Sequence, residues 1–280
     1  MEKIDFHIHT TLSDGDFDIN KIIELSKKNG CYKISITDHE VIKDYSNVGK
    51  ENGIEIINGI EFNCSEKGLH ILGYGIEDIY DISNFVDILH RENESVSYQL
   101  IDNLNRAGYD ITAEKVKEFL YSKNLIYDYL DKRHIVKYLI DIGVTKNVYD
   151  TYKNLIGSGT KFYLPLKKIS VVDIIHKIDE SGGVAVLAHP YTLKLDNKEL
   201  LIKIRELVDY GLSGIEVING RMPKELSDIY VEIANVFGLI KTIGSDFHNE
   251  MTDNIGLVYS EEVYNDLTTK MKQKSKKREI

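Results

Sequence analysis

The stretch that decides the fold, Asp5-Phe6-His7-Ile8-His9, lies within residues 3–10, a run with the composition of a β-strand. Residues i and i+2 of a strand project to the same side, so His7 and His9 point together. Asp14 follows on a turn that contains Gly15. Two imidazoles and a carboxylate form a ligand mixture that Zn, Mn and Fe accept. A His-x-His pair is equally common in an ordinary sheet, so the rest of the chain has to decide between the two interpretations.

Composition limits the class of protein. The chain has 280 residues, of which 42% are hydrophobic, enough for one large domain or one domain that carries an insertion. Its net charge of -10 argues against broad electrostatic binding to nucleic acid, although metal ions and a few local cations could hold an anionic substrate. Cys31 and Cys64 fit a reducing compartment, and one structural disulfide remains an alternative. Without a long apolar run or a signal-peptide pattern, we expect a cytoplasmic protein with no membrane association.

Strand and helix patterns alternate on both sides of a central segment. After the first strand, the strand patterns cover residues 32–39, 54–62 and 69–74 before this segment, and 184–190, 214–219 and 239–248 after it. Helix patterns separate most of them, with Asp18 and Ser170 as expected N-caps. Such alternation predicts parallel strands joined by right-handed crossovers.

The central segment, residues 82–165, has helical periodicity instead. We expect a long helix closed by Gly108, a second capped by Thr112, and a third before Gly143. The predicted organisation is a discontinuous α/β domain, residues 1–81 and 166–280, with a helical insertion at 82–165. The insertion has 11 acidic and 11 basic side chains, so it repels an anionic ligand less than the rest of the chain does. The Lys-rich tail, residues 270–280, is expected to be frayed.

Candidate ligands share one position along the chain. Each lies at or just past the C-terminal end of a predicted parallel strand, with Asp14 on a following loop; the others are His7, His9, His39, Glu61, His70, His189, Asp246 and His248. In a barrel of β/α units, active sites are assembled on this face. Six imidazoles and three carboxylates are too many for one metal ion and suit two or three. A bridging water activated by such ions predicts hydrolysis of phosphate esters without a covalent intermediate. Cys64 is expected to be a small buried residue.

These residues lie in motifs that resemble those of the PHP (polymerase and histidinol phosphatase) family, most closely its TrpH-like branch. The similarity extends from residue 4 to about residue 258. The motifs are His7-Ile8-His9, Ser13-Asp14-Gly15, Thr37-Asp38-His39, Gly59-Ile60-Glu61, His70-Ile71-Leu72-Gly73-Tyr74, Ala188-His189-Pro190 and Gly244-Ser245-Asp246-Phe247-His248. The resemblance implies a distorted (β/α)7 barrel. One departure is Glu40, where members often have Asp, and it is not among the implied ligands.

The resemblance also implies a trinuclear centre of Mn, Fe or Zn ions. One ion would be held by His7, His9, Glu61 and Asp246, a second by Glu61, His70 and His189, and a third by Asp14, His39 and His248. Glu61, Asp246 and His248 would take the catalytic roles.

Residues of the insertion are implied to bind the substrate. Lys132-Arg133-His134 is similar to a family segment whose basic residue and histidine hold the phosphate of the substrate. We favour Arg133 over Lys132, because a planar guanidinium binds phosphate through two hydrogen bonds, and we include His134. The alternative is a set of solvated charges at a helix start. Lys161 and Arg221 are weaker candidates.

By resemblance, the substrate is a nucleoside 3',5'-bisphosphate that loses its 3'-phosphate, or a short 5'-phosphorylated RNA trimmed from its 5' end. Histidinol phosphate is the alternative substrate within the enzyme class. A non-catalytic module that binds metal or nucleic acid is the alternative of another class, and a C-N hydrolase with the same barrel is a third. No protein partner is predicted.

Overall fold

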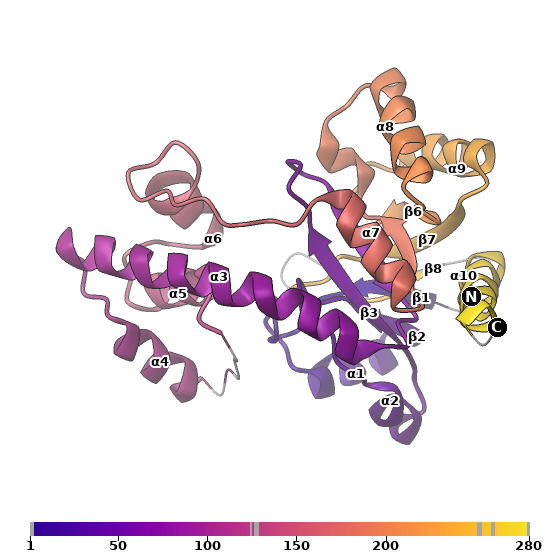
Figure 1. Ribbon diagram of the computed structural model, residues 1–280. Helices are drawn as coiled ribbons and strands as arrows, with labels where there is room; N and C mark the ends of the chain where they lie inside the picture. Colours follow the sequence, from indigo (N-terminus) through magenta and orange to yellow (C-terminus); the bar gives the residue numbers. More distant parts are fainter. Residues whose placement is uncertain (1–2, 124, 126–128, 251–253, 259–260, 279–280) are drawn as a thin grey trace. The chain divides into compact units, whose positions relative to one another are not determined.

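The computed structural model describes residues 3–123, 125, 129–250, 254–258 and 261–278 (Figure 1). The chain divides into two compact units. The first, here the barrel unit, consists of Met1–Asn84 and Ile169–Ile280, and the second, the helical unit, consists of Phe85–Lys168.

The barrel unit is built on one eight-stranded sheet in the order β7-β6-β5-β4-β3-β2-β1-β8. The strands are β1 (Lys3–Ile8), β2 (Cys31–Ile36), β3 (Glu55–Asn63), β4 (His70–Tyr74), β5 (Val184–Leu187), β6 (Gly214–Asn219), β7 (Ile240–Gly244) and β8 (Leu257–Val258). Strands β1, β2 and β3 are parallel to one another, as are β5, β6 and β7. The predicted α/β class is therefore confirmed.

Contacts between β1 and the end of β7 close the sheet into a barrel. The amide of His9 donates to the carbonyl of Phe247 over 2.9 Å, and the amide of Asp246 donates to the carbonyl of His7 over 2.9 Å. The short β8 pairs with Lys3 and Ile4 at the opposite end of β1. Seven strands therefore form the expected barrel, and β8 adds an antiparallel edge.

The prediction that every strand is parallel is wrong for β4. This strand pairs antiparallel with both β3 and β5. Only residues 64–69 connect β3 to β4, and a connection this short permits a hairpin but no crossover helix. His70 is consequently the first residue of its strand, and the reversed direction brings it to the edge where the parallel strands end.

Six helices are described in full within the barrel unit: α1 (Ile19–Lys28), α2 (Ser46–Asn52), α7 (Val171–Glu180), α8 (Asn197–Asp209), α9 (Glu225–Phe237) and α10 (Glu261–Arg278). Asp18 caps α1 by accepting from the amide of Lys21, and Ser170 caps α7, both as predicted. The tail is helical rather than frayed as far as the structure describes it. Leu267 is fully buried, and the Tyr264 hydroxyl donates to Glu55, so tertiary contacts hold α10 in place.

Alternation along β1 separates the core from the interior of the barrel. Ile8 packs outward into a hydrophobic cluster with Ile22 and Leu25 of α1 and with Ile36 of β2. The neighbouring side chain of His7 therefore projects to the other face of the sheet. Burial of the apolar positions under the helices thus fixes which strand residues face the barrel interior.

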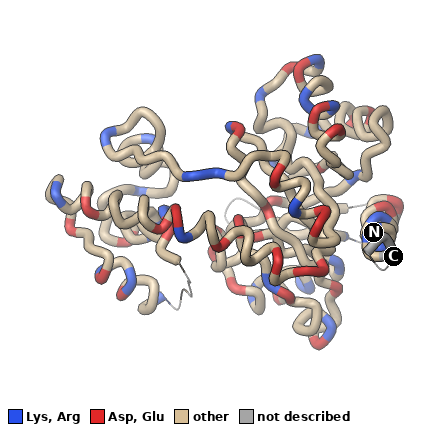
Figure 2. The backbone as a smooth tube through the Cα atoms, in the orientation of Figure 1, with Lys and Arg blue, Asp and Glu red and all other residues tan. Residues whose placement is uncertain are grey.

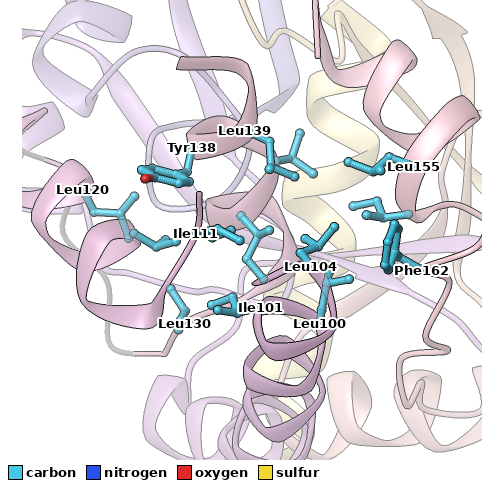
Figure 3. Close-up of a cluster of buried hydrophobic side chains, with 14 residues drawn as sticks. Leu100, Ile101, Leu104, Ile111, Leu120, Leu130, Tyr138, Leu139, Leu155 and Phe162 are labelled. Carbon is cyan, nitrogen blue, oxygen red and sulfur yellow. The ribbon is translucent and has the colours of Figure 1, made fainter. Parts of the chain in front are cut away.

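The helical unit contains most of α3 (Ile79–Arg106), together with α4 (Ala113–Ser122), α5 (Lys132–Asp141), α6 (Val148–Thr151) and a π-helical turn (Tyr152–Ile156). Thr112 caps α4 as predicted. Figure 3 shows the core of this unit, in which Leu100 and Leu104 of α3 pack with Leu139 of α5, Leu155 of the π turn and Phe162 of the following loop. The unit thus has a hydrophobic core of its own.

Both cysteines are buried, and neither forms a disulfide. Among the helices that the structure describes, none is long and apolar enough to cross a bilayer.

Candidate metal centre

The structure brings all nine predicted ligand residues together where the parallel strands end. They lie at the end of β1 and just after it (His7, His9), on the following turn (Asp14), after β2 (His39), in β3 (Glu61), at the start of β4 (His70), after β5 (His189) and after β7 (Asp246, His248). They form four overlapping groups whose ligand atoms lie within 4.8 Å of one another: His9-Asp14-His39-His248, His7-His9-Asp246, His7-Glu61-His189 and His39-Glu61-His70.

Glu61 lies in the middle of the cluster and is 1% exposed. Its Oε1 is 2.9 Å from His70 Nδ1 and 2.8 Å from His189 Nε2. Its Oε2 is 3.2 Å from His9 Nε2 and 3.3 Å from His7 Nε2. The two oxygens of this carboxylate therefore face two different sets of imidazoles, which is the arrangement a ligand shared by two metal ions needs.

Two further carboxylates stand on either side of His9. Asp246 Oδ1 is 3.4 Å from His9 Nε2, and Asp14 Oδ1 is 3.4 Å from His9 Nδ1. Asp14 also lies 3.4 Å from His248 Nε2 and 3.7 Å from His39 Nε2. His9 therefore belongs to two of the four ligand groups, the one with Asp246 and the one with Asp14.

The buried nitrogens of the first motif fit a metal site. Within the described part of the chain, Nε2 of His7 and Nε2 of His9 are both buried and have no hydrogen-bond partner of good geometry. A buried polar atom without a partner costs free energy unless another group satisfies it. Both atoms point at carboxylate oxygens 3.2 to 3.6 Å away, the spacing that a cation between imidazole and carboxylate ligands would bridge.

The ionisable groups shift one another toward their charged forms. Burial alone would lower the pKa of His9, but Asp246, Glu61 and Asp14 raise that pKa to about 10. Burial would likewise raise the pKa of Glu61, and the charges of His39, His7 and His70 outweigh it and hold that pKa well below its usual range. Such a site favours positive charge, and a divalent cation would displace the protons from the rings.

Strained backbone turns two of the candidate ligands into the cluster. His189 has φ 25° and Asp246 has φ 58°, in the left-handed region that residues with a side chain seldom adopt. Each such residue costs of order 1–3 kcal/mol and persists where the surrounding structure imposes it. Each lies two residues past the end of its strand, so the strain redirects the chain at the point where the side chain enters the site.

The sequence analysis gave no role to Glu216, which is fully buried in β6. Its Oε1 lies 3.1 Å from His7 Nδ1, and its Oε2 accepts from the amide of His189 over 2.7 Å and from Asn219 Nδ2 over 3.0 Å. An ionised carboxylate only accepts, so the Nδ1 atom of His7 carries the hydrogen and its Nε2 is left to face Glu61. In the sequence, the sign of this role was a single acidic residue within a strand pattern, residues 214–219, whose other members are mostly apolar.

Asp38 was quoted within a motif but was given no role. Its carboxylate accepts from the amide of Thr10 over 2.7 Å, from the Thr10 hydroxyl over 2.7 Å and from the Ser13 hydroxyl over 2.6 Å. These bonds tie the loop that carries Asp14 to the end of β2. Asp38 therefore positions a candidate ligand from the neighbouring strand.

The predicted substrate-binding residues lie at the start of α5, in the helical unit. Arg133 places Nη2 2.6 Å and Nε 2.9 Å from Asp131 Oδ2. His134 Nδ1 accepts from the amide of Asp131 over 3.1 Å and so completes a capping box. Lys132 is 5% exposed and donates to the carbonyl of Leu164. The alternative that these side chains are solvated charges at a helix start is therefore wrong. Their contact with a substrate stays a prediction.

The weaker candidate Arg221 lies beside the cluster. Its Nη1 is 3.5 Å from Asp246 Oδ2, and its Nη2 is 3.1 Å from His248 Nδ1. The side chain is 39% exposed, so this cation contacts both solvent and a candidate ligand. Lys161 lies in the helical unit, next to Phe162.

Three curated relatives are similar to almost the whole chain. A 5'-3' exoribonuclease of Haemophilus influenzae is 25% identical over 270 residues, which cover 92% of this chain and 96% of the relative. A phosphoribosyl 1,2-cyclic phosphate 1,2-diphosphodiesterase of Eggerthella lenta is 28% identical over 88% of this chain and 94% of the relative. A 3',5'-nucleoside bisphosphate phosphatase of Chromobacterium violaceum is 25% identical over 89% of this chain and 88% of the relative. All three relatives act on phosphate esters.

A solved structure has the same fold. It is the crystal structure of a protein of Bifidobacterium adolescentis that is provisionally assigned as a metal-dependent phosphoesterase, with a TM-score of 0.79 and 21% identity over 95% of this chain and 96% of that one. The family model of the PHP domain matches residues 5–165, which is more than half of the 280 residues. This chain therefore belongs to the PHP domain family.

Proposed function

We propose that this protein is a metal-dependent phosphoesterase that hydrolyses phosphate esters of nucleotides, with water as the nucleophile. The observation that carries the proposal is the convergence of six imidazoles and three carboxylates around the buried Glu61. Two or three bound divalent ions would lower the pKa of a water molecule, bind the non-bridging oxygens of a phosphate and stabilise the charge on the attacking and leaving oxygens.

In this proposal the ligands fall into three sets, and the cations are Mn, Fe or Zn. The first set is His7, His9, Glu61 and Asp246; the second is Glu61, His70 and His189; the third is Asp14, His39 and His248. The groups of the structure support the first and third sets, with His9 also adjoining the third. His70 and His189 of the second set fall in different groups, although both lie next to Glu61 Oε1. Imidazole and carboxylate ligands suit all three metals, and Mn is our first choice for assay.

Asp246 is proposed to orient the attacking hydroxide as well as to bind a cation. The imidazoles of His7 and His9 lower its pKa against the opposing effect of burial, so the carboxylate is ionised at neutral pH. Its Oδ1 faces those two rings, and its Oδ2 lies near Arg221. Oδ2 is therefore the oxygen that can accept a hydrogen bond from an attacking water or hydroxide and orient it.

Glu61 and His248 complete the proposed catalytic set. Glu61 holds the imidazoles on both of its sides in one orientation. His248 Nδ1 lies 2.8 Å from the carbonyl of Asp246 and 3.1 Å from Arg221 Nη2, and Nε2 is directed toward Asp14. The ring therefore presents its second nitrogen to the third ligand set.

The proposed substrates are a nucleoside 3',5'-bisphosphate and short 5'-phosphorylated RNA. Relatives with 24–25% identity that carry these two activities support them. We propose that residues 82–165 are a substrate-binding subdomain in which Arg133 and His134 contact the phosphate. Burial of two reduced cysteines supports a cytoplasmic location.

The test is phosphate release by the Mn-loaded protein from adenosine 3',5'-bisphosphate. Histidinol phosphate, phosphoribosyl 1,2-cyclic phosphate and a short 5'-phosphorylated RNA are assayed beside it, with His9→Ala as the blank. We expect turnover of the nucleotide or the RNA, and loss of both bound metal and turnover in His9→Ala.

Each other outcome changes the proposal. Preference for histidinol phosphate or the cyclic phosphate would keep the centre and reject the nucleotide substrates. Bound metal without turnover of any substrate would support a non-catalytic module. Full activity with unchanged metal content in His9→Ala would reject the centre itself.

A further inference from the structure

We propose that a basic and aromatic segment of the helical unit, residues 146–163, binds single-stranded RNA along its sugar-phosphate backbone and exposed bases. The inference rests on the proposed function in that it supplies a surface for the part of an RNA substrate beyond its hydrolysed end. It concerns a different set of residues from those at the start of α5.

Exposed tyrosines mark this segment. Tyr149 of α6 is 70% exposed, Tyr152 of the π turn is 38% exposed and Tyr163 of the following loop is 44% exposed. Tyr149 and Lys153 lie on the same side of this helical segment, four residues apart. Lys153 Nζ is 5.3 Å from the centroid of the Tyr149 ring, which confirms that the two side chains are neighbours.

The segment is positively charged in an acidic protein. Residues 146–163 contain three lysines and one aspartate, whereas the whole chain has a net charge of -10. The one acid, Asp150, is engaged by hydrogen bonds, its Oδ2 with the amide of Lys146 and its Oδ1 with Asn154 Nδ2. Figure 2 shows lysine and arginine positions along this segment and along the connection that follows it. This segment therefore attracts a polyanion, whereas the acidic remainder of the chain repels it.

The backbone presents the aromatic face in a defined geometry. The turn Tyr152–Ile156 is π-helical, and the amide of Gly157 closes it by donating to the carbonyl of Tyr152 over 2.9 Å. A Cβ atom at position 157 would lie 2.1 Å from that carbonyl oxygen, so only glycine permits the closure. Buried Leu155 and Ile156 fix the opposite side of the turn in the core. A π turn is uncommon and is often found at functional sites.

The composition of the surface favours RNA over a protein partner. Protein interfaces are depleted in lysine, whereas single-stranded nucleic acids are bound by cations that follow the phosphates and by aromatic rings on which bases stack. Lys146, Lys153 and Lys161 are all exposed and lie among the tyrosines along the chain. The segment supplies both components, and its tyrosines stack on any base, so binding should depend little on sequence.

The experiment measures binding of a 3'-fluorescein-labelled, 5'-phosphorylated single-stranded RNA of about ten nucleotides. Fluorescence anisotropy is recorded with the full chain in EDTA, which prevents hydrolysis. The test variant is Tyr149→Ala with Lys153→Ala. The matched control is Tyr80→Ala with Lys50→Ala, an exposed tyrosine and an exposed lysine of the barrel unit. Circular dichroism verifies that each variant is folded.

We expect the test variant to bind the RNA about tenfold more weakly and the control to bind like the wild type. A second variant, with alanine at Lys146, Lys153 and Lys161, should reduce the slope of log K against log salt by about 2, at about 0.7 per phosphate contact. A dinucleotide should bind the wild type and the test variant equally, because it is too short to extend along the segment.

Equal RNA affinity of the wild type and the test variant would overturn the proposal, as would equal salt slopes or preferential binding of an acidic peptide. Its failure is distinct from failure of the proposed function. Turnover of adenosine 3',5'-bisphosphate together with unchanged RNA affinity rejects the segment alone. Segment-dependent RNA binding without turnover of any phosphate ester rejects the enzyme alone.

Discussion

Glu216 acts on two candidate ligands at once. One of its oxygens fixes the ring of His7, and the other accepts from the backbone of His189. Gly244 of the neighbouring strand allows this packing, because a Cβ atom there would lie 2.2 Å from His7 Cβ and 2.9 Å from Glu216 Oε1. A carboxylate behind a metal-binding histidine sets the tautomer of the ring and raises its basicity.

We predict that Glu216→Gln weakens metal binding by about 10- to 100-fold. The amide group of glutamine can donate to Nδ1 of His7, which would move the hydrogen of the ring to Nε2 and remove the lone pair that faces Glu61. Isothermal titration with Mn measures the affinity, and circular dichroism verifies the fold. Glu232→Gln, on the exposed face of α9, is the control. Unchanged affinity in Glu216→Gln would contradict the assigned tautomer.

Arg133 provides a second prediction for a single residue. Arg133→Ala should raise the Michaelis constant for a 3',5'-bisphosphate more than that for a simple aryl phosphate, because only the bisphosphate offers a second phosphate group to a guanidinium. Arg91→Ala, an exposed arginine of α3, is the control. Equal changes for both substrates would remove Arg133 from substrate recognition and leave it as the partner of Asp131 alone.

At the scale of a single element, the first turn of α5 is held by the side chain of Asp131. The side chain of Asp131 accepts from the amides of Arg133 and His134 and is paired with the Arg133 guanidinium. Burial alone would raise the pKa of this carboxyl, but the charges of Arg133 and His134 outweigh burial and lower the pKa. A carboxyl whose pKa is lower in the folded state stabilises the fold above its unfolded pKa of about 3.9.

We therefore predict that Asp131→Asn lowers the free energy of unfolding by about 1–3 kcal/mol at neutral pH. Asparagine caps a helix nearly as well as aspartate, so the difference reports the charge. As the pH falls below about 4, the unfolded wild-type chain takes up a proton at this carboxyl while the folded protein does not, so the difference between the two proteins should shrink progressively. Urea unfolding of both proteins at several pH values measures this difference in the free energy of unfolding. A difference that does not change with pH would show that the charge of Asp131 contributes nothing.

At the scale of the molecule, the candidate centre joins both halves of the barrel unit. Ligands from residues 7–70 and from residues 189–248 meet there, although the helical unit separates these segments along the chain. A cation that binds only the folded barrel stabilises it by mass action. The core of the helical unit contains none of the ligand residues.

Removal of metal by EDTA should therefore destabilise the barrel unit and leave the helical unit unchanged. At a metal concentration of a hundred times Kd, the lost stabilisation is about 2.7 kcal/mol. It should decrease as the pH falls, because protons bind the raised-pKa rings of His7 and His9 in competition with the metal. Calorimetry and hydrogen exchange, with and without EDTA, measure both effects. Equal loss of exchange protection in residues 100–139 would contradict the separation of the two units.

The sequence by itself determined the class of the fold, the caps of several helices and the types of ligand at the strand ends. These features depend on local rules: a period of two in strands, a period of 3.6 in helices, and the hydrogen bonds that Asp18, Thr112 and Ser170 make within three residues. The same local rule identifies Asp131 as a helix cap, so its pairing with Arg133 could have been predicted from the sequence.

Only the tertiary structure decided the packing of α10 and the role of Glu216, whereas the short connection before β4 already permits only a hairpin. Both depend on a partner far away in the chain: Tyr264 of α10 on Glu55, and Glu216 on His7, which lies 209 residues earlier. Local periodicity shows that a residue is buried or exposed, but the neighbour that it meets there is set by how the strands close into a barrel. The nine ligand residues could be named from their positions because closure brings strand ends together, whereas their distances and hydrogen-bond partners follow from the closed barrel alone.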